Sequence, residues 1–170
     1  LYTYWLYDYA GVNPQNGNAL WRNEEGLLTE NYGEARRINA GSPEPLWTGG
    51  FNTELSWKGI SLGIQLEARY GNKVLNQDRS LFEADGSYGD SNIWKGAMNY
   101  WKKPGDTNVL PKPVYNNSSN SSAISTRYLE DGSYLRIKDI TLAYSLPSKW
   151  TKKALMSGVR IYASALNLYT

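Results

Sequence analysis

The fold is decided by residues 51–70, which read FNTELSWKGISLGIQLEARY. From Ile60 to Tyr70 apolar side chains alternate with polar or small ones at every position, and residues 51–57 alternate in the same way. A period of two is typical of a strand with one apolar face. Lys58 and Gly59 separate the two segments, and a two-residue connection of this kind favours a tight antiparallel hairpin.

Weaker patterns predict three further strands. Residues 159–165 alternate, and so does the later half of 133–146. The phase of the latter slips near Lys138-Asp139, which indicates either a β-bulge or a strand that passes from one environment to another. Residues 1–10 are aromatic on both faces and have no clean period. We therefore expect an all-β chain of antiparallel strands near 1–10, 50–57, 60–70, 133–146 and 159–170.

The connections between these strands are unequal. Residues 12–49 and 71–132 are long, polar and rich in Asn, Gly, Ser and Pro, whereas 58–59 and 147–158 are short. If neighbouring strands are antiparallel, both long connections leave one end of the sheet. Within them we expect one helix, from Ile93 to Lys102, capped by Ser91 or Asn92. A second short helix is expected after Pro147, with Ser148 as its N-cap.

Composition excludes several classes of site. The 170 residues contain no Cys and no His, which removes thiolate catalysis, the Ser-His-Asp triad and most transition-metal sites. The formal charge of +2 gives no indication of a nucleic-acid partner. We expect no catalytic residue, no metal and no cofactor. The chain opens on Leu1 rather than Met, so we expect a processed chain or a piece of a longer one.

Two acidic stretches have an ordinary interpretation. Asp85, Ser87 and Asp90 are spaced loosely like a calcium loop, but a solvated turn is the favoured interpretation. Glu130-Asp131 before Gly132 is expected to form a turn into the next strand rather than a pair of catalytic carboxylates.

Strands of about ten residues with one apolar face are typical of two architectures. In an outer-membrane barrel the apolar face meets lipid and the long loops leave one end. In a soluble β-sandwich, such as a secreted carbohydrate-binding module, the same face meets a second sheet. Alternation alone does not separate these interpretations. The 7 Trp and 14 Tyr, against 2 Phe, are amphipathic residues that suit a boundary between apolar and aqueous surroundings.

Several motifs carry a resemblance to a known family. Residues 41–51 read GSPEPLWTGGF, residues 70–73 read YGNK, and residues 127–147 read RYLEDGSYLRIKDITLAYSLP. With DYAGVNP at 8–14, GN at 17–18 and RIYASALNLYT at 160–170, they keep order and spacing over nearly the whole chain. This pattern resembles the late-barrel region of SusC/RagA-type TonB-linked outer-membrane transporters.

The resemblance implies a part of a larger assembly. Such transporters form a barrel of about 22 strands with an N-terminal plug, in the outer membrane of Gram-negative bacteria. They import oligosaccharides or peptides with a SusD-like surface lipoprotein as lid, driven by the TonB complex, which would be contacted through a missing N-terminal part. This chain would supply about five strands from the C-terminal part of the barrel, with 12–49 and 71–132 as loops at the cell surface.

The same resemblance assigns faces and contacts. Gln65, Glu67 and Arg69 are expected to face the lumen. Trp94, Tyr100 and Trp101, on the expected loop helix, are candidates for contact with cargo or lid; the alternative is that they only pack the helix onto neighbouring loops. The residues expected to face outer-membrane lipid are Ile60, Leu62, Ile64, Leu66, Ile140, Leu142 and Leu146.

Overall fold

The computed structural model describes residues 2–87, 92–115, 117, 119–153 and 155–170. The chain divides into two compact units. Unit 1 comprises Leu1–Pro43 and Lys73–Asp131, and unit 2 comprises Glu44–Asn72 and Gly132–Thr170. No helix in these described stretches is both long and apolar enough to cross a bilayer.

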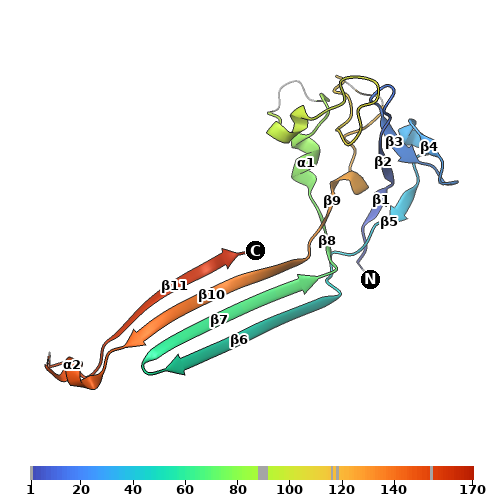
Figure 1. Ribbon diagram of the computed structural model, residues 1–170. Coiled ribbons are helices and arrows are strands. Elements are labelled where there is room, and N and C mark those ends of the chain that lie inside the picture. Colours follow the sequence, from blue (N-terminus) through green and yellow to red (C-terminus); the bar gives the residue numbers. More distant parts are fainter. Residues whose placement is uncertain (1, 88–91, 116, 118, 154) are drawn as a thin grey trace. The chain divides into compact units, whose positions relative to one another are not determined.

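Unit 2 is a four-stranded antiparallel sheet in the order β11-β10-β7-β6 (Figure 1). Its strands are β6 (Trp47–Trp57), β7 (Ile60–Tyr70), β10 (Tyr134–Ser145) and β11 (Arg160–Tyr169). A short helix, α2 (Ser148–Lys153), lies between β10 and β11 and begins at the serine predicted as its cap.

The hairpin between β6 and β7 is confirmed. Lys58 and Gly59 both have positive φ, 47° and 87°, as the type I′ turn requires. A Cβ on Gly59 would lie 2.8 Å from the carbonyl oxygen of Ser145, so glycine is also required by this close approach of β10.

The register gathers most large apolar residues of unit 2 on one face; Leu166, which is paired with Asp139, lies on the other. Leu62 of β7 is paired with Leu55 on one side and with Leu142 on the other, and directly paired residues of antiparallel strands project to the same face. We call this side the apolar face. Thr53, paired with Ile64, and Leu135, paired with Ala68, also project to this side. The apolar residues over its middle and turn end are Phe51, Leu55, Trp57, Ile60, Leu62, Ile64, Leu66, Ile137, Ile140, Leu142, Tyr144, Ile161, Ala163 and Ala165.

The predicted bulge is confirmed, and it explains the slip of phase. Ile137 pairs with Leu66 and Asp139 pairs with Gln65, so Lys138 is an extra residue in β10. The bulge therefore puts Ile137 and Ile140 on the same face although their separation in sequence is odd.

The apolar face has no second layer among the described residues of unit 2. The side of the sheet that a β-sandwich would bury carries large exposed side chains, such as Leu55 at 61% and Ile161 at 62%. A β-sandwich packs a second sheet about 10 Å away on that side. The described part of unit 2 contains one sheet only, with β6 and β11 as its edges.

Unit 1 is built from short elements around an aromatic core. Trp21 and Tyr128 are fully buried, and the Trp21 ring has Tyr9 and Tyr32 at centroid distances of 5.4 and 5.1 Å. Its elements are β1 (Trp5–Tyr7), β2 (Tyr9–Val12), β3 (Ala19–Arg22), β4 (Leu28–Thr29), β5 (Arg37–Asn39), β8 (Lys73–Leu75), β9 (Leu129–Asp131), α1 (Gln77–Phe82) and the 3₁₀ turns η1 (Tyr32–Glu34), η2 (Lys95–Met98) and η3 (Thr126–Tyr128).

Three predictions about unit 1 are wrong. Residues 1–10 do not form a strand of the large sheet, because β1 pairs with β5 and β2 pairs with β3. The stretches 12–49 and 71–132 are not plain loops, since they contain five short strands and α1, and β6 already begins at Trp47. The helix expected from Ile93 to Lys102 is only the 3₁₀ turn η2; Tyr100 forms a β-bridge with Leu110 instead. Its expected cap Ser91 lies outside the described residues.

Candidate functional site

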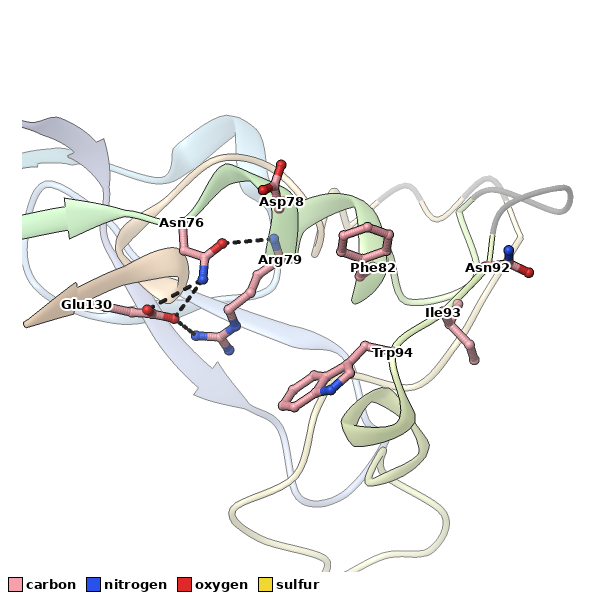
Figure 2. Close-up of a pocket in the computed structure, with 8 residues that line it drawn as sticks. All are labelled: Asn76, Asp78, Arg79, Phe82, Asn92, Ile93, Trp94 and Glu130. Carbon is pink, nitrogen blue, oxygen red and sulfur yellow. Dashed lines mark hydrogen bonds and ion pairs between the residues drawn. The ribbon is translucent and has the colours of Figure 1, made fainter. Parts of the chain in front are cut away.

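A hollow of unit 1, about 900 Å³ in volume, lies against α1. We call it the α1 pocket (Figure 2). It combines a polar side with an apolar side, which is the usual composition of a small-ligand site. The residues that line it are Asn76, Asp78, Arg79, Phe82, Asn92, Ile93, Trp94 and Glu130.

Asn76 fixes the start of α1. Its side-chain Oδ1 accepts a hydrogen bond from the Arg79 backbone N–H at 3.3 Å, and its own backbone N–H donates to the Tyr128 carbonyl at 2.9 Å. An asparagine in this position caps a helix by satisfying an otherwise unpaired N–H. At the other end of α1, the Trp94 backbone N–H donates to the Phe82 carbonyl at 3.1 Å. These contacts hold Phe82 and Trp94 in one pocket.

Charged side chains continue from the pocket into the interior of unit 1. Arg79 Nη1 lies 2.8 Å from Glu130, and Arg79 Nε lies 2.8 Å from Glu83. Arg127 then bridges Glu83, at 3.5 Å, and Asp85. Signs therefore alternate along the five residues, which we call the charge chain. Figure 2 shows its outer end, with Arg79 extending from α1 to Glu130 and Asn76 beside the same carboxylate.

Burial differs along the charge chain. The side chains of Glu83, Asp85 and Arg127 are at most 3% exposed, whereas Arg79 and Glu130 are 31% and 41% exposed. Buried ions are tolerated only when they are paired and hydrogen-bonded. The inner three residues therefore compensate one another's charge inside unit 1, and the outer two remain accessible from the α1 pocket.

The electrostatics keep Glu130 and Arg127 charged. The hydrogen bond from Arg79 holds the pKa of the Glu130 carboxyl below its ordinary value, although partial burial opposes this. Burial opposes the charge of Arg127, yet its hydrogen bond and ion pair with Asp85 raise the pKa of that guanidinium. Burial also raises the pKa of Tyr9 to about 12. The arrangement suits recognition by fixed charge and apolar contact rather than proton transfer near neutral pH.

The predicted aromatic contacts are separated in the structure. Trp94 lines the α1 pocket with 56% of its surface exposed. Tyr100 and Trp101 lie at another hollow, of about 390 Å³. Trp101 is 9% exposed, and its indole N–H donates to the Pro14 carbonyl at 3.0 Å. This burial favours the packing alternative for Trp101, whereas Trp94 and Tyr100 stay candidates for contact.

The residues predicted to face the lumen share the polar face of the unit 2 sheet. Glu67 accepts a hydrogen bond from the Tyr134 hydroxyl at 2.7 Å and lies 3.2 Å from Lys138 Nζ. Arg69 Nε is 3.7 Å from the same carboxylate. Gln65 lies between Asn52 and Asp139 in the ladder. All of these side chains project opposite to the apolar face.

The structure also shows where the described residues of the two acidic stretches lie. Asp85 is held by Arg127, and Asp90, the last of the three residues compared with a calcium loop, lies outside the described residues. Within the described stretches no cluster of acidic side chains could hold a metal ion. The expected turn at Glu130-Asp131 is wrong: both residues belong to β9, where Asp131 lies 3.5 Å from Lys73.

Sequence reasoning missed most of the α1 pocket. Only Trp94 was predicted as a contact, and Arg79, Phe82 and Glu130 were not. The four-residue spacing of Arg79 and Glu83, following Asn76, is a signal that could have located α1. Nothing in the sequence pairs this segment with Glu130, because the contact spans 51 residues.

Comparisons with known proteins agree on one family. No family model matches the chain. The TonB-dependent receptor P3 of Formosa agariphila is 33% identical over 136 residues, 80% of this chain and 13% of that receptor. The TonB-dependent receptor P26 of the same organism is 28% identical over 163 residues, 94% of this chain and 15% of the receptor. This chain thus spans about a seventh of the length of these curated relatives.

Solved structures show the same likeness. The RagAB peptide transporter matches 98% of this chain and 19% of its own chain, with a TM-score of 0.80 and 30% identity. The RagAB peptide importer in its "open-open" state matches 98% of this chain and 18% of its own, with a TM-score of 0.78 and 30% identity. The chain belongs to the SusC/RagA-type family of TonB-dependent transporters.

Proposed function

We propose that this chain is part of the barrel wall and surface loops of an importer in the outer membrane of a Gram-negative bacterium. The observation that carries the proposal is the apolar face of unit 2. It is continuous over all four strands, and it is exposed. In a transmembrane barrel such a face meets lipid.

The lengths and exposures of the strands fit this role. The four strands contain 10 to 12 residues, close to the length of about 9–11 residues that a tilted strand needs to cross a bilayer. Leu55, Leu142 and Ile161 are all more than half exposed. Transfer of one such side chain from water to an apolar medium contributes about 1.5–3 kcal/mol when it becomes fully buried. Lipid therefore supplies the second layer that the sheet lacks.

The polar face would line the lumen. The cluster of Glu67, Tyr134, Lys138 and Arg69 satisfies its charges within the sheet while remaining partly exposed. Such a cluster is costly against lipid and stable against water, so its position opposite the apolar face supports this orientation of the wall.

Unit 1 would carry the cell-surface part of the importer. Its α1 pocket offers Trp94 and Phe82 for apolar contact and the Arg79–Glu130 pair for polar contact, a combination that suits oligosaccharides or peptides. A SusD-like lipoprotein would cover this surface, and the TonB complex would act through another part of the complete protein. The name of the RagAB peptide transporter supports peptide as one cargo class.

Fractionation of the native bacterium tests this function. The complete protein that contains this sequence, tagged at its own locus, is expected in the outer-membrane fraction together with a co-purifying surface lipoprotein. Deletion of the gene should abolish growth on one class of oligosaccharide or peptide while growth on monomers continues. Recovery in the soluble periplasmic fraction would refute the wall assignment, and purification without any lipoprotein would refute the lid.

A further inference from the structure

Lysine and tryptophan side chains gather at one end of the unit 2 sheet. The β6–β7 turn and the β10–β11 connection meet there, because the Ser145 N–H donates to the Gly59 carbonyl at 2.7 Å. The Leu146 N–H donates to the Val159 carbonyl at 2.9 Å, which closes the base of the α2 connection. We call residues 57–60, 146–153 and 155–160 the turn rim. Figure 1 shows α2 at this end of the sheet.

The turn rim is strongly basic. It contains five of the 18 Lys and Arg residues and none of the 16 acidic residues, so the remainder of the chain carries a net negative charge. In the described part of unit 2, none of these cations is paired with a carboxylate. The basic residues are Lys58, Lys149, Lys152, Lys153 and Arg160.

Large apolar side chains accompany these charges. Trp57 and Trp150 are 68% and 61% exposed, and Leu155 is 97% exposed. Lys58 Nζ lies 4.6 Å from the centre of the Trp57 ring. Thr151 is buried, which seats α2 and leaves its neighbour Trp150 exposed. Exposed tryptophan beside unpaired lysine suits a boundary where an acyl layer meets phosphate headgroups.

We propose that the turn rim binds anionic glycerophospholipid. The lysines of α2 would contact the headgroup phosphates, and Trp150 and Leu155 would enter the acyl boundary. Charge complementarity identifies the occupant, because a surface with five cations and no acid repels basic partners and attracts anionic lipid. The proposal rests on the proposed function: with the long connections 12–49 and 71–132 at the cell surface, the short turns at the other end of the strands lie at the periplasmic leaflet.

Lipid titration of the complete receptor tests this inference. The receptor, purified from the outer membrane in detergent, is titrated with dioleoylphosphatidylglycerol or dioleoylphosphatidylcholine, and bound lipids are counted by native mass spectrometry. We expect several phosphatidylglycerol molecules to bind in preference to phosphatidylcholine. The variant K149Q/K152Q/K153Q should lose at least one of these and require about tenfold more phosphatidylglycerol for the same occupancy.

Two further variants serve as controls. K95Q/K102Q/K103Q removes three exposed lysines of unit 1 and should bind phosphatidylglycerol as the parent does. K149R/K152R/K153R keeps the charge of α2 and should also bind as the parent does. Equal binding by the parent and by K149Q/K152Q/K153Q would overturn the proposal, and so would an equal loss in the unit 1 control.

A measurement on the unmodified receptor covers the case in which the α2 variant fails to fold. Raising NaCl from 0.1 to 0.5 M should weaken phosphatidylglycerol binding severalfold and leave phosphatidylcholine unchanged. Salt-independent binding would contradict the proposal. Retention of lipopolysaccharide or of an acidic periplasmic protein in place of phosphatidylglycerol would also overturn it. Failure of the proposed function is distinct, because the parent would then be absent from the outer-membrane fraction.

Discussion

Arg127 holds Asp85 with both of its terminal nitrogens: Nη2 lies 2.9 Å from Oδ1, and Nη1 contacts Oδ2. The two residues are 42 positions apart, and both side chains are almost fully buried. The same Nη1 donates to the Ser121 carbonyl at 2.8 Å. This pair therefore joins the end of the α1 segment to the start of η3, and it supports the α1 pocket from within.

Replacing Arg127 tests the buried end of the charge chain. Arg127→Gln leaves Asp85 buried without its cation and Glu83 paired only with Arg79. This should lower the local free energy of opening by about 3–5 kcal/mol. Amide hydrogen exchange of the complete receptor over residues 77–87 and 121–131 measures this. Arg22→Gln, at an exposed arginine of the same unit, should leave the exchange unchanged. Exchange as slow as in the parent in both variants would show that the Arg127–Asp85 pair does not stabilise these segments.

Gly17 is required by its contact with Trp101. Its φ is +80°, and an added Cβ would lie 2.7 Å from the Trp101 ring. Gly26 has a similar φ of +82°, but its nearest neighbour, Arg36 Nη1, would be 4.0 Å away. Gly26→Ala should therefore lower the free energy of unfolding by about 1–2 kcal/mol, because alanine is strained in the left-handed conformation. Gly17→Ala should lower it by about 1–3 kcal/mol more, because the added Cβ also clashes with Trp101. Hydrogen exchange over residues 13–29, which include both glycines, compares the two variants, and equal effects would exclude the clash.

Substitution of Trp94 tests whether cargo binds in the α1 pocket. Trp94→Ala should weaken cargo binding by the complete importer about tenfold, which corresponds to about 1.4 kcal/mol. Trp150→Ala is the matched control, because that indole is exposed to a similar extent but lies on unit 2. Calorimetry with the cargo on which the bacterium grows measures both. Equal affinity of the parent and Trp94→Ala for the cargo would show that the cargo does not contact Trp94 in this pocket.

The ion pair between Glu130 and Arg79 is expected to weaken in acid. The pKa of its carboxyl is lowered in the folded chain by Arg79 below the ordinary value of 4.5, so its stabilising contribution is complete above pH 4.5 and is lost as the pH falls through the folded value. Exchange over residues 76–83 should therefore accelerate more below pH 4.5 in the parent than in Glu130→Gln. The reverse order would contradict the sign of the shift.

The large sheet could be predicted from sequence because its information is local. The alternation of Ile60 to Tyr70 and the pair Lys58-Gly59 determine β7 and its hairpin without reference to other residues. The slip at Lys138 likewise identifies the bulge from one strand alone. Each of these features depends on neighbours within a few positions, where the period of a strand is directly visible.

Unit 1 could not be predicted in the same way because its contacts are distant. Six residues of α1 are too few to show a helical period, and the contacts of Arg79 with Glu130 and of Arg127 with Asp85 span 51 and 42 positions. The helix predicted at Ile93 to Lys102 was wrong because Trp101 makes its backbone contacts across the chain, donating to the Leu110 carbonyl at 2.9 Å. Pairing of this kind overrides local propensity.

Site-directed spin labelling of β7 distinguishes an apolar face of unit 2 that meets lipid from one that meets water. Nitroxides are placed one at a time at Ser61, Leu62, Ile64 and Gln65 of the complete receptor in liposomes, and collisions with oxygen and with a water-soluble nickel chelate are measured. If the apolar face meets lipid, labels at Leu62 and Ile64 are accessible to oxygen and shielded from nickel, whereas labels at Ser61 and Gln65 are accessible to nickel. Nickel access at all four positions, or the opposite alternation, would contradict contact with lipid.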